Sequence, residues 1–115
     1  MDSRTLDALT AAPDHHRLSY EDDQVRVLET QVLPGQTTPL HTHSWPSLNY
    51  VVSFAPFVRR DEHGDVVLDS REAGVELEAG QSFRSGPLPL HSLENVGDRP
   101  IHVISVEFKE NVNGA

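Results

Sequence analysis

The segment at residues 35–43, Gly-Gln-Thr-Thr-Pro-Leu-His-Thr-His, decides how the rest of the chain is interpreted. It begins at a turn signal, Pro34-Gly35, and ends in a pair of histidines, His41 and His43. Successive side chains of a β-strand point to opposite faces, so residues two apart share a face. In an extended segment the two imidazoles therefore converge above one face of the sheet. Neutral imidazole is a common ligand of transition metals, so the pair predicts a metal site.

A third ligand for such a metal is expected from the second half of the chain, because two side chains rarely hold a catalytic metal. The candidate is His91. It follows a loop at residues 86–90 whose two prolines stiffen the backbone and restrict how the imidazole approaches the pair. We therefore predict a metal centre formed by His41, His43 and His91.

The other histidines receive different interpretations. His15 and His16 are adjacent, and adjacent side chains of an extended segment point apart, so they cannot both join one site. Both are expected at the surface or at a strand end. His63 lies in a polar hairpin tip and is expected to be exposed to solvent. His102 is interpreted as an ordinary strand residue, with a place in the pocket as the alternative.

These segments resemble the two sequence motifs of the cupin superfamily, in a region that spans about residues 25–109. The matching positions are Gly35, His41 and His43 in the first motif and Gly80, His91 and Asn95 in the second. The Glu of the first motif falls at Ser47 or Leu48, so the usual carboxylate ligand is missing. The Pro-x-Gly triplet of the second motif is replaced by Gly-Pro-Leu at residues 86–88. The resemblance implies an all-β fold, a cupin-type double-stranded β-helix (jelly-roll) barrel.

The pattern of short apolar segments also favours an all-β barrel or sandwich. The expected strands lie at residues 25–32, 37–43, 48–54, 57–60, 66–68, 75–78 and 101–109. Turns rich in Gly and Pro separate them, and no segment is a convincing helix. We expect a flexible N-terminal arm over residues 1–14 and a single cupin domain over residues 15–115.

The composition narrows the possible partners. The chain has 115 residues with a formal net charge of −9, which opposes binding to nucleic acid or to an anionic membrane surface. It has no cysteine, which excludes disulfides, thiolate zinc sites and cysteine nucleophiles. No apolar run approaches the roughly 20 residues needed to cross a bilayer, and no secretory signal is recognised. We expect a cytoplasmic protein that binds a small molecule.

The strand expected at residues 48–54 has one polar and one apolar face. If Ser47 takes the position of the missing Glu, Ser47 and Asn49 look into the barrel and are the candidates to orient water or substrate at the metal. The outward residues are then Leu48, Tyr50, Val52 and Phe54. An outward apolar stripe needs a cover, so a homodimer is expected. The alternative orientation places the apolar residues in the core.

Two further residues are candidates for ligand contacts. Trp45 directly follows the histidine pair and is a candidate for the rim of the pocket, with a structural wedge as the alternative. Arg84 is the base nearest the second motif in sequence, so an anionic substrate could use it.

A centre of neutral histidines without a carboxylate carries more positive charge than the usual one, which favours anionic ligands. Similar three-histidine sites occur in cupin-like thiol dioxygenases and diketone-cleaving dioxygenases. The resemblance therefore implies a metal-dependent cupin enzyme, a three-histidine non-haem iron dioxygenase-type oxidoreductase acting on a small polar molecule. Iron(II) is the favoured cofactor, with zinc, nickel, manganese and copper as alternatives. The other candidate functions are a non-catalytic small-molecule-binding or sensing cupin and a metal-dependent isomerase or lyase.

The histidine ligands also predict a dependence on pH. Ligation requires neutral imidazole, whose ordinary pKa is about 6.5. Metal affinity is therefore expected to fall below roughly pH 6.

Overall fold

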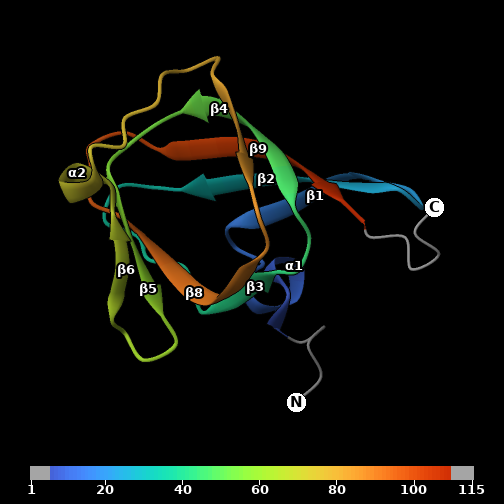
Figure 1. Cartoon of the computed structure of the whole chain (residues 1–115), viewed down its shortest axis with the longest axis horizontal. Helices are drawn as coiled ribbons and strands as arrows, with labels where there is room; N and C mark the ends of the chain where they lie inside the picture. The colour runs from blue at the N-terminus through green and yellow to red at the C-terminus, as the bar shows by residue number, and fades with distance from the viewer. Residues whose placement is uncertain (1–5, 110–115) are drawn as a thin grey trace.

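The computed structural model describes residues 6–109, in which two antiparallel sheets face each other across a shared interior (Figure 1). The strands are β1 (His16–Glu21), β2 (Val25–Val32), β3 (His41–His43), β4 (Ser47–Ser53), β5 (Phe57–Asp61), β6 (Val66–Asp69), β7 (Ser82–Ser85), β8 (Leu88–Asn95) and β9 (Ile101–Phe108). One sheet has the order β1-β2-β9-β4-β7, and the other has the order β3-β8-β5-β6. The predicted all-β barrel is confirmed.

Most predicted strands lie close to their expected bounds. Residues 25–32 form β2, and the predicted hairpin is formed by β5 and β6 around a turn in which Gly64 has a φ of 84°. The predicted orientation of β4 is also confirmed. Ser47 and Asn49 are buried and face the interior, whereas the alternating residues Leu48, Tyr50 and Val52 are exposed to solvent.

Several expectations about local structure are wrong. Residues 75–78 form no strand, because β4 already pairs with β7 on that side and no strand of the described sheets is left to pair with them. Two short helices were not predicted, α1 (Ala8–Ala11) and α2 (Ser70–Ala73). The strand containing His91 begins at Leu88, inside the expected loop, and only residues 41–43 of the expected strand at 37–43 form β3. Phe54 lies beyond the end of β4 and lines the interior instead of the outer face.

The N-terminal segment is packed against the barrel from residue 6 onward, so the expected flexible arm over residues 1–14 is wrong for that part; residues 1–5 lie outside the described range. Asp7 caps α1 by accepting a hydrogen bond from the backbone N–H of Leu9 at 3.1 Å. Ala8 and Ala12 are fully buried, and the small alanine side chains let the helix lie directly on β1 and β3. The partner of Asp7 is the distant Arg26, which local sequence does not reveal.

The interior holds an apolar cluster and a polar cluster. The apolar cluster is formed by Val32, Ala55 and Ile101, with Phe57, Leu93 and Val103 packed against it. The polar cluster contains histidines from three strands and is described below. Among the described residues, no helix is long and apolar enough to cross a membrane.

Candidate metal centre

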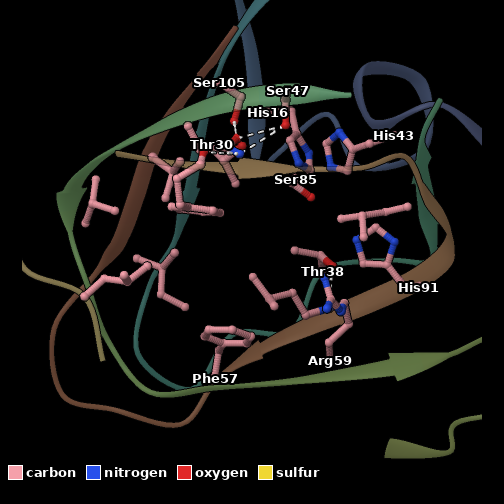
Figure 2. A pocket seen from close by; sticks show the side chains of 18 of the residues that line it. His16, Thr30, Thr38, His43, Ser47, Phe57, Arg59, Ser85, His91 and Ser105 are labelled. Carbon is pink, nitrogen blue, oxygen red and sulfur yellow. Dashed lines mark hydrogen bonds between the residues drawn. The ribbon is translucent and has the colours of Figure 1, made fainter. Parts of the chain in front are cut away.

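Four histidines meet in the barrel interior: His16 from β1, His41 and His43 from β3, and His91 from β8. Figure 2 labels three of them, His16, His43 and His91. The ring of His41 lies 4.7 Å from that of His16, 5.1 Å from that of His43 and 4.4 Å from that of His91, measured between centroids. The candidate ligand atoms of His16, His41 and His43 all lie within 4.8 Å of one another. The ring of His91 lies 5.7 Å from that of His43, and His91 is outside this group of three.

Each of the four imidazoles uses its Nδ1 atom to contact an oxygen that can only accept a hydrogen bond. The pairs are His16 with the Ala12 carbonyl (3.0 Å), His41 with the Pro39 carbonyl (2.8 Å), His91 with the Pro89 carbonyl (2.7 Å) and His43 with the Glu107 carboxylate (3.0 Å). Nδ1 must therefore carry the proton, and in a neutral imidazole Nε2 then keeps its lone pair. This arrangement is the usual one around metal-binding histidines, and in three of them, His16, His41 and His43, the ligand atoms are also close enough to share a metal ion.

Burial keeps three of these imidazoles uncharged. Desolvation lowers the pKa of His16 to about 3, that of His41 to about 4 and that of His91 to about 3, from an ordinary value of 6.5. Hydrogen bonds to the backbone carbonyls oppose the shift but do not overcome it. The three side chains are thus neutral at neutral pH, which is the form that binds metal.

A chain of hydrogen-bonded charged side chains, Glu107, Arg26 and Asp7, begins at Nδ1 of His43. The Glu107 carboxylate accepts from Nδ1 of His43 through one oxygen and from Nε of Arg26, at 2.7 Å, through the other. Arg26 also donates two hydrogen bonds to Asp7, at 2.8 and 2.9 Å. Glu107 is 1% exposed, so its charge depends on these partners. For Asp7, burial raises the pKa of the carboxyl, but the hydrogen bonds and charge of Arg26 outweigh it and lower the pKa below its ordinary value.

Glu107 also accounts for the carboxylate that the first motif lacks. In the sheet, Glu107 on β9 lies directly across from Ser47 on β4, and both line the cavity. The acid is therefore supplied from the neighbouring strand, where it orients His43 through its Nδ1 atom. The pairing joins residues far apart in the chain, and no local motif could reveal it.

The rings of the predicted ligands His41, His43 and His91 lie near one another, but the group whose ligand atoms are close enough to share a metal has His16 in place of His91. The expectation that His15 and His16 both lie at the surface or at a strand end is wrong in one respect. His16 is the first residue of β1 but is buried and faces the cluster, while His15 points to the opposite side and contacts the Gln31 carbonyl. The predicted alternation of His15 and His16 is therefore confirmed. The sequence contains no signal for which of these two histidines faces the interior.

The remaining polar candidates have structural partners. His102 contacts Glu29 through Nε2 at 2.7 Å, which fits an ordinary strand residue, and His63 is exposed. Asn95 is fully buried and holds the turn before β9 by bonding the carbonyls of Val32 and Arg99. Neither His102 nor Asn95 lines the cavity.

Trp45 and Arg84 do not line the cavity either, so the structure does not support a pocket role for them. The Arg26 guanidinium lies over the Trp45 ring at 4.9 Å, and Trp45 therefore covers the buried charge chain. Arg84 is exposed and stacks on Phe108 at 5.4 Å. The alternation of β7 turns its neighbours Phe83 and Ser85 inward and Arg84 outward.

The histidines open onto a cavity of about 180 Å³ between the two sheets. Ser47 and Asn49 line it beside Ser105, which donates to the Asn49 side-chain oxygen at 2.6 Å. The Asn49 amide group also donates to the Ser47 hydroxyl and to the Phe83 carbonyl. The Ser47 hydroxyl in turn donates to the Asn49 side-chain oxygen at 3.3 Å, so Asn49 is engaged by the protein and Ser47 keeps one acceptor lone pair for a ligand. Most of the remaining wall is apolar, and Arg59 projects into it (Figure 2).

No protein-family model and no curated protein matches this sequence. Solved structures with a similar fold include a cupin domain from Bordetella pertussis, with a TM-score of 0.66 and 21% identity over 83% of this chain and 92% of that one. A double-stranded β-helix protein from Klebsiella pneumoniae has a TM-score of 0.56 and 23% identity, covering 84% and 72%. The polyketide cyclase RemF from Streptomyces resistomycificus has a TM-score of 0.55 and 19% identity, covering 87% and 68%.

The fold and the histidine cluster define the class of structure: this chain folds as a double-stranded β-helix like that of the cupin domains, with a three-histidine group, His16, His41 and His43, close enough to hold a metal. It departs from the usual first motif in having Ser47 at the position of the Glu. The similarity to the solved structures concerns the fold.

Proposed function

We propose that the protein binds one divalent transition metal through His16, His41, His43 and His91. The observation that carries the proposal is the set of four Nδ1 hydrogen bonds, which leaves four Nε2 lone pairs available in one cluster. Imidazole ligands suit iron, zinc, copper and nickel, and we favour iron(II) as the working metal. All four ligands are neutral in the metal-binding form, so the bound ion keeps its full charge and favours anionic partners.

We further propose that the metal-bound protein is a dioxygenase-type oxidoreductase acting on a small molecule held in the cavity. Iron(II) at this site would supply the redox chemistry needed to use dioxygen. The protein's own residues do the rest: apolar walls exclude water, the Ser47 hydroxyl orients the substrate, and Glu107 fixes the orientation of His43. Asn49 acts by positioning Ser47, to which its amide group donates a hydrogen bond.

Metal binding is tested first. Protein purified without an affinity tag or added metal is analysed for its elements and then titrated with iron(II), zinc and manganese after chelation. Replacing any one of the four histidines by Ala should weaken binding tenfold or more, since loss of a supporting partner alone costs that much. His63→Ala, at an exposed hairpin tip, is the matched control and should bind as the wild type does. Unchanged affinity in His16→Ala or in His91→Ala would remove that residue from the ligand set.

The reaction is tested separately, by oxygen consumption of the iron(II)-loaded protein over a panel of β-dicarbonyls, catechols and thiols. Consumption that depends on both iron and substrate supports a dioxygenase. Tight metal binding with no oxygen consumption over the panel would instead favour the alternatives, a non-catalytic binding or sensing cupin or a metal-dependent isomerase or lyase.

A further inference from the structure

Arg59 differs from the buried Arg26 in having no acidic partner among the described residues. It lies on β5, is half-buried and projects into the cavity from the sheet that also carries His91 (Figure 2). Within residues 6–109, no carboxylate lies within 4 Å of its guanidinium, and no hydrogen bond of its side chain is formed. Four other arginines do have acidic partners: Arg17, Arg26, Arg60 and Arg71.

The nearest acid in sequence does not neutralise Arg59. Asp61 lies two residues further along β5, and one of its carboxylate oxygens accepts hydrogen bonds from the backbone N–H groups of His63 and Asp65. It is committed to the hairpin turn. Burial lowers the pKa of Arg59, which reflects a charge moved out of water without compensation by the protein. A half-buried, unpaired guanidinium is costly, and an anionic ligand would relieve that cost.

The surroundings of Arg59 fit a carboxylate attached to an apolar body. The Thr38 hydroxyl, on the same cavity wall, accepts a hydrogen bond from the backbone N–H of Leu93 at 3.0 Å, so its own proton remains available to a ligand. Phe57, Leu93 and Val103 supply apolar surface between the two sheets. A guanidinium matches the planar geometry of a carboxylate and can bind both of its oxygens.

We propose that the cavity binds a small organic carboxylate, with its carboxylate group on Arg59 and its apolar body against Phe57, Leu93 and Val103. A small organic carboxylate is thus the substrate class that we infer for the site. Only its role as a substrate rests on the proposed function. The binding itself requires no metal. It can therefore be tested on metal-free protein, in which Arg59 is separated from any contribution of a bound ion.

The test measures binding of benzoate and of its neutral analogue benzamide to metal-free protein at pH 7 by calorimetry or by nuclear magnetic resonance titration. Benzoate should bind the wild type at least tenfold more tightly than benzamide does. Arg59→Met should weaken benzoate binding about tenfold to a hundredfold, the cost of losing a charge-assisted hydrogen bond. Arg59→Lys should fall between the two, because it keeps the charge and loses the planar fork. Arg84→Met removes the same charge from an exposed site and should bind benzoate as the wild type does.

Equal affinity of the wild type for benzoate and benzamide, absence of benzoate binding, or wild-type affinity in Arg59→Met would each overturn the inference. If Arg59→Met does not fold, the comparison of benzoate with benzamide and the Arg59→Lys variant still decide the question. The outcome is also distinct from that of the proposed function. Metal binding without a role for Arg59 would refute only this inference, whereas benzoate binding in a protein that takes up no metal would refute only the metal centre.

Discussion

Acidification should destabilise the metal-free protein well above the pH at which its carboxylates titrate. His16, His41 and His91 have pKa values of about 3 to 4 in the folded protein, against 6.5 in an unfolded chain. Below pH 6.5 the unfolded chain therefore binds protons that the folded protein does not. The free energy of unfolding falls as the pH falls through the window from about 6.5 to 4, because a depressed histidine pKa makes the unfolded state the better proton acceptor.

The magnitude follows from the same values. At pH 5.5 each unfolded imidazole gains about 1.4 kcal/mol from protonation, so the three together remove about 4 kcal/mol of stability relative to neutral pH. That is a large share of the roughly 5–15 kcal/mol typical of a whole domain. For a chain of this length it corresponds to a decrease in melting temperature of roughly 15 °C.

The assay is urea unfolding in the presence of a chelator, at pH values from about 7 down to 5, a range set by the imidazole pKa. His91→Gln removes one of the three titrating groups and should reduce the pH dependence by about a third of its wild-type size, as proton linkage requires. His63→Gln, at an exposed position, should leave it unchanged. Stability that is flat between pH 7 and 5.5, or an equal slope in His91→Gln, would refute the assignment of buried neutral imidazoles.

The same pKa values revise an expectation based on the sequence. Free imidazoles predict that metal affinity falls below roughly pH 6. In the folded protein, proton competition at His16, His41 and His91 begins near pH 4 instead. These three residues therefore do not explain a loss of metal at mildly acidic pH by proton competition in the folded protein. Such a loss would reflect unfolding, which exposes their imidazoles to protons.

Three further predictions concern Glu107, Ser47 and the outer face. Glu107→Gln should weaken metal binding about tenfold and cost about 3 kcal/mol of stability, because it removes the charge that orients His43 and leaves Arg26 underpaired. Metal titration measures the first effect and urea unfolding the second. Unchanged values would contradict the role of the hydrogen-bonded chain from Asp7 to His43. Ser47→Glu should tighten manganese binding but destabilise the metal-free protein, since it places a second carboxylate directly across from Glu107; unchanged manganese affinity would mean that position 47 does not reach the metal. The exposed apolar side chains of β4, among them Tyr50, predict a homodimer, and Tyr50→Glu should shift it to monomer; light scattering that finds only the 12.8 kDa species for the wild type would rule the dimer out.

The part of the site that follows local rules could be predicted from the sequence. His41 and His43 share a face because strand residues alternate, and the register of β3 and β8 places His41 directly opposite His91. Both of these opposed residues follow a Pro-Leu pair, Pro39-Leu40 and Pro89-Leu90, and both use the carbonyl of that proline. The repeated Pro-Leu-His triplet is a local signal for how the two rings are oriented.

The part that depends on distant pairing could not be predicted. His16 reaches the cluster because β1 pairs with β2, with His16 opposite Thr30, and because the chain before β1 folds back to offer the Ala12 carbonyl. Glu107 takes its place only through the register of β9 with its neighbours. Proximity in sequence indicates Arg84 as the base that contacts an anionic ligand. The arginine that lines the cavity is Arg59, which lies on the other sheet.

The contacts made by the first described residues join the N-terminal segment to the candidate binding site. The segment carries His16 of the proposed ligand set, and it supports His43 indirectly, since Asp7 binds Arg26 and Arg26 binds Glu107. If a metal binds only when this segment is docked, thermodynamic reciprocity requires that the metal also hold the segment in place by the same free energy. Metal occupancy could then be measured as the resistance of the peptide bonds before β1 to cleavage by a protease. A substitution that undocks the segment, such as one at Asp7, would then weaken metal uptake although Asp7 does not line the cavity.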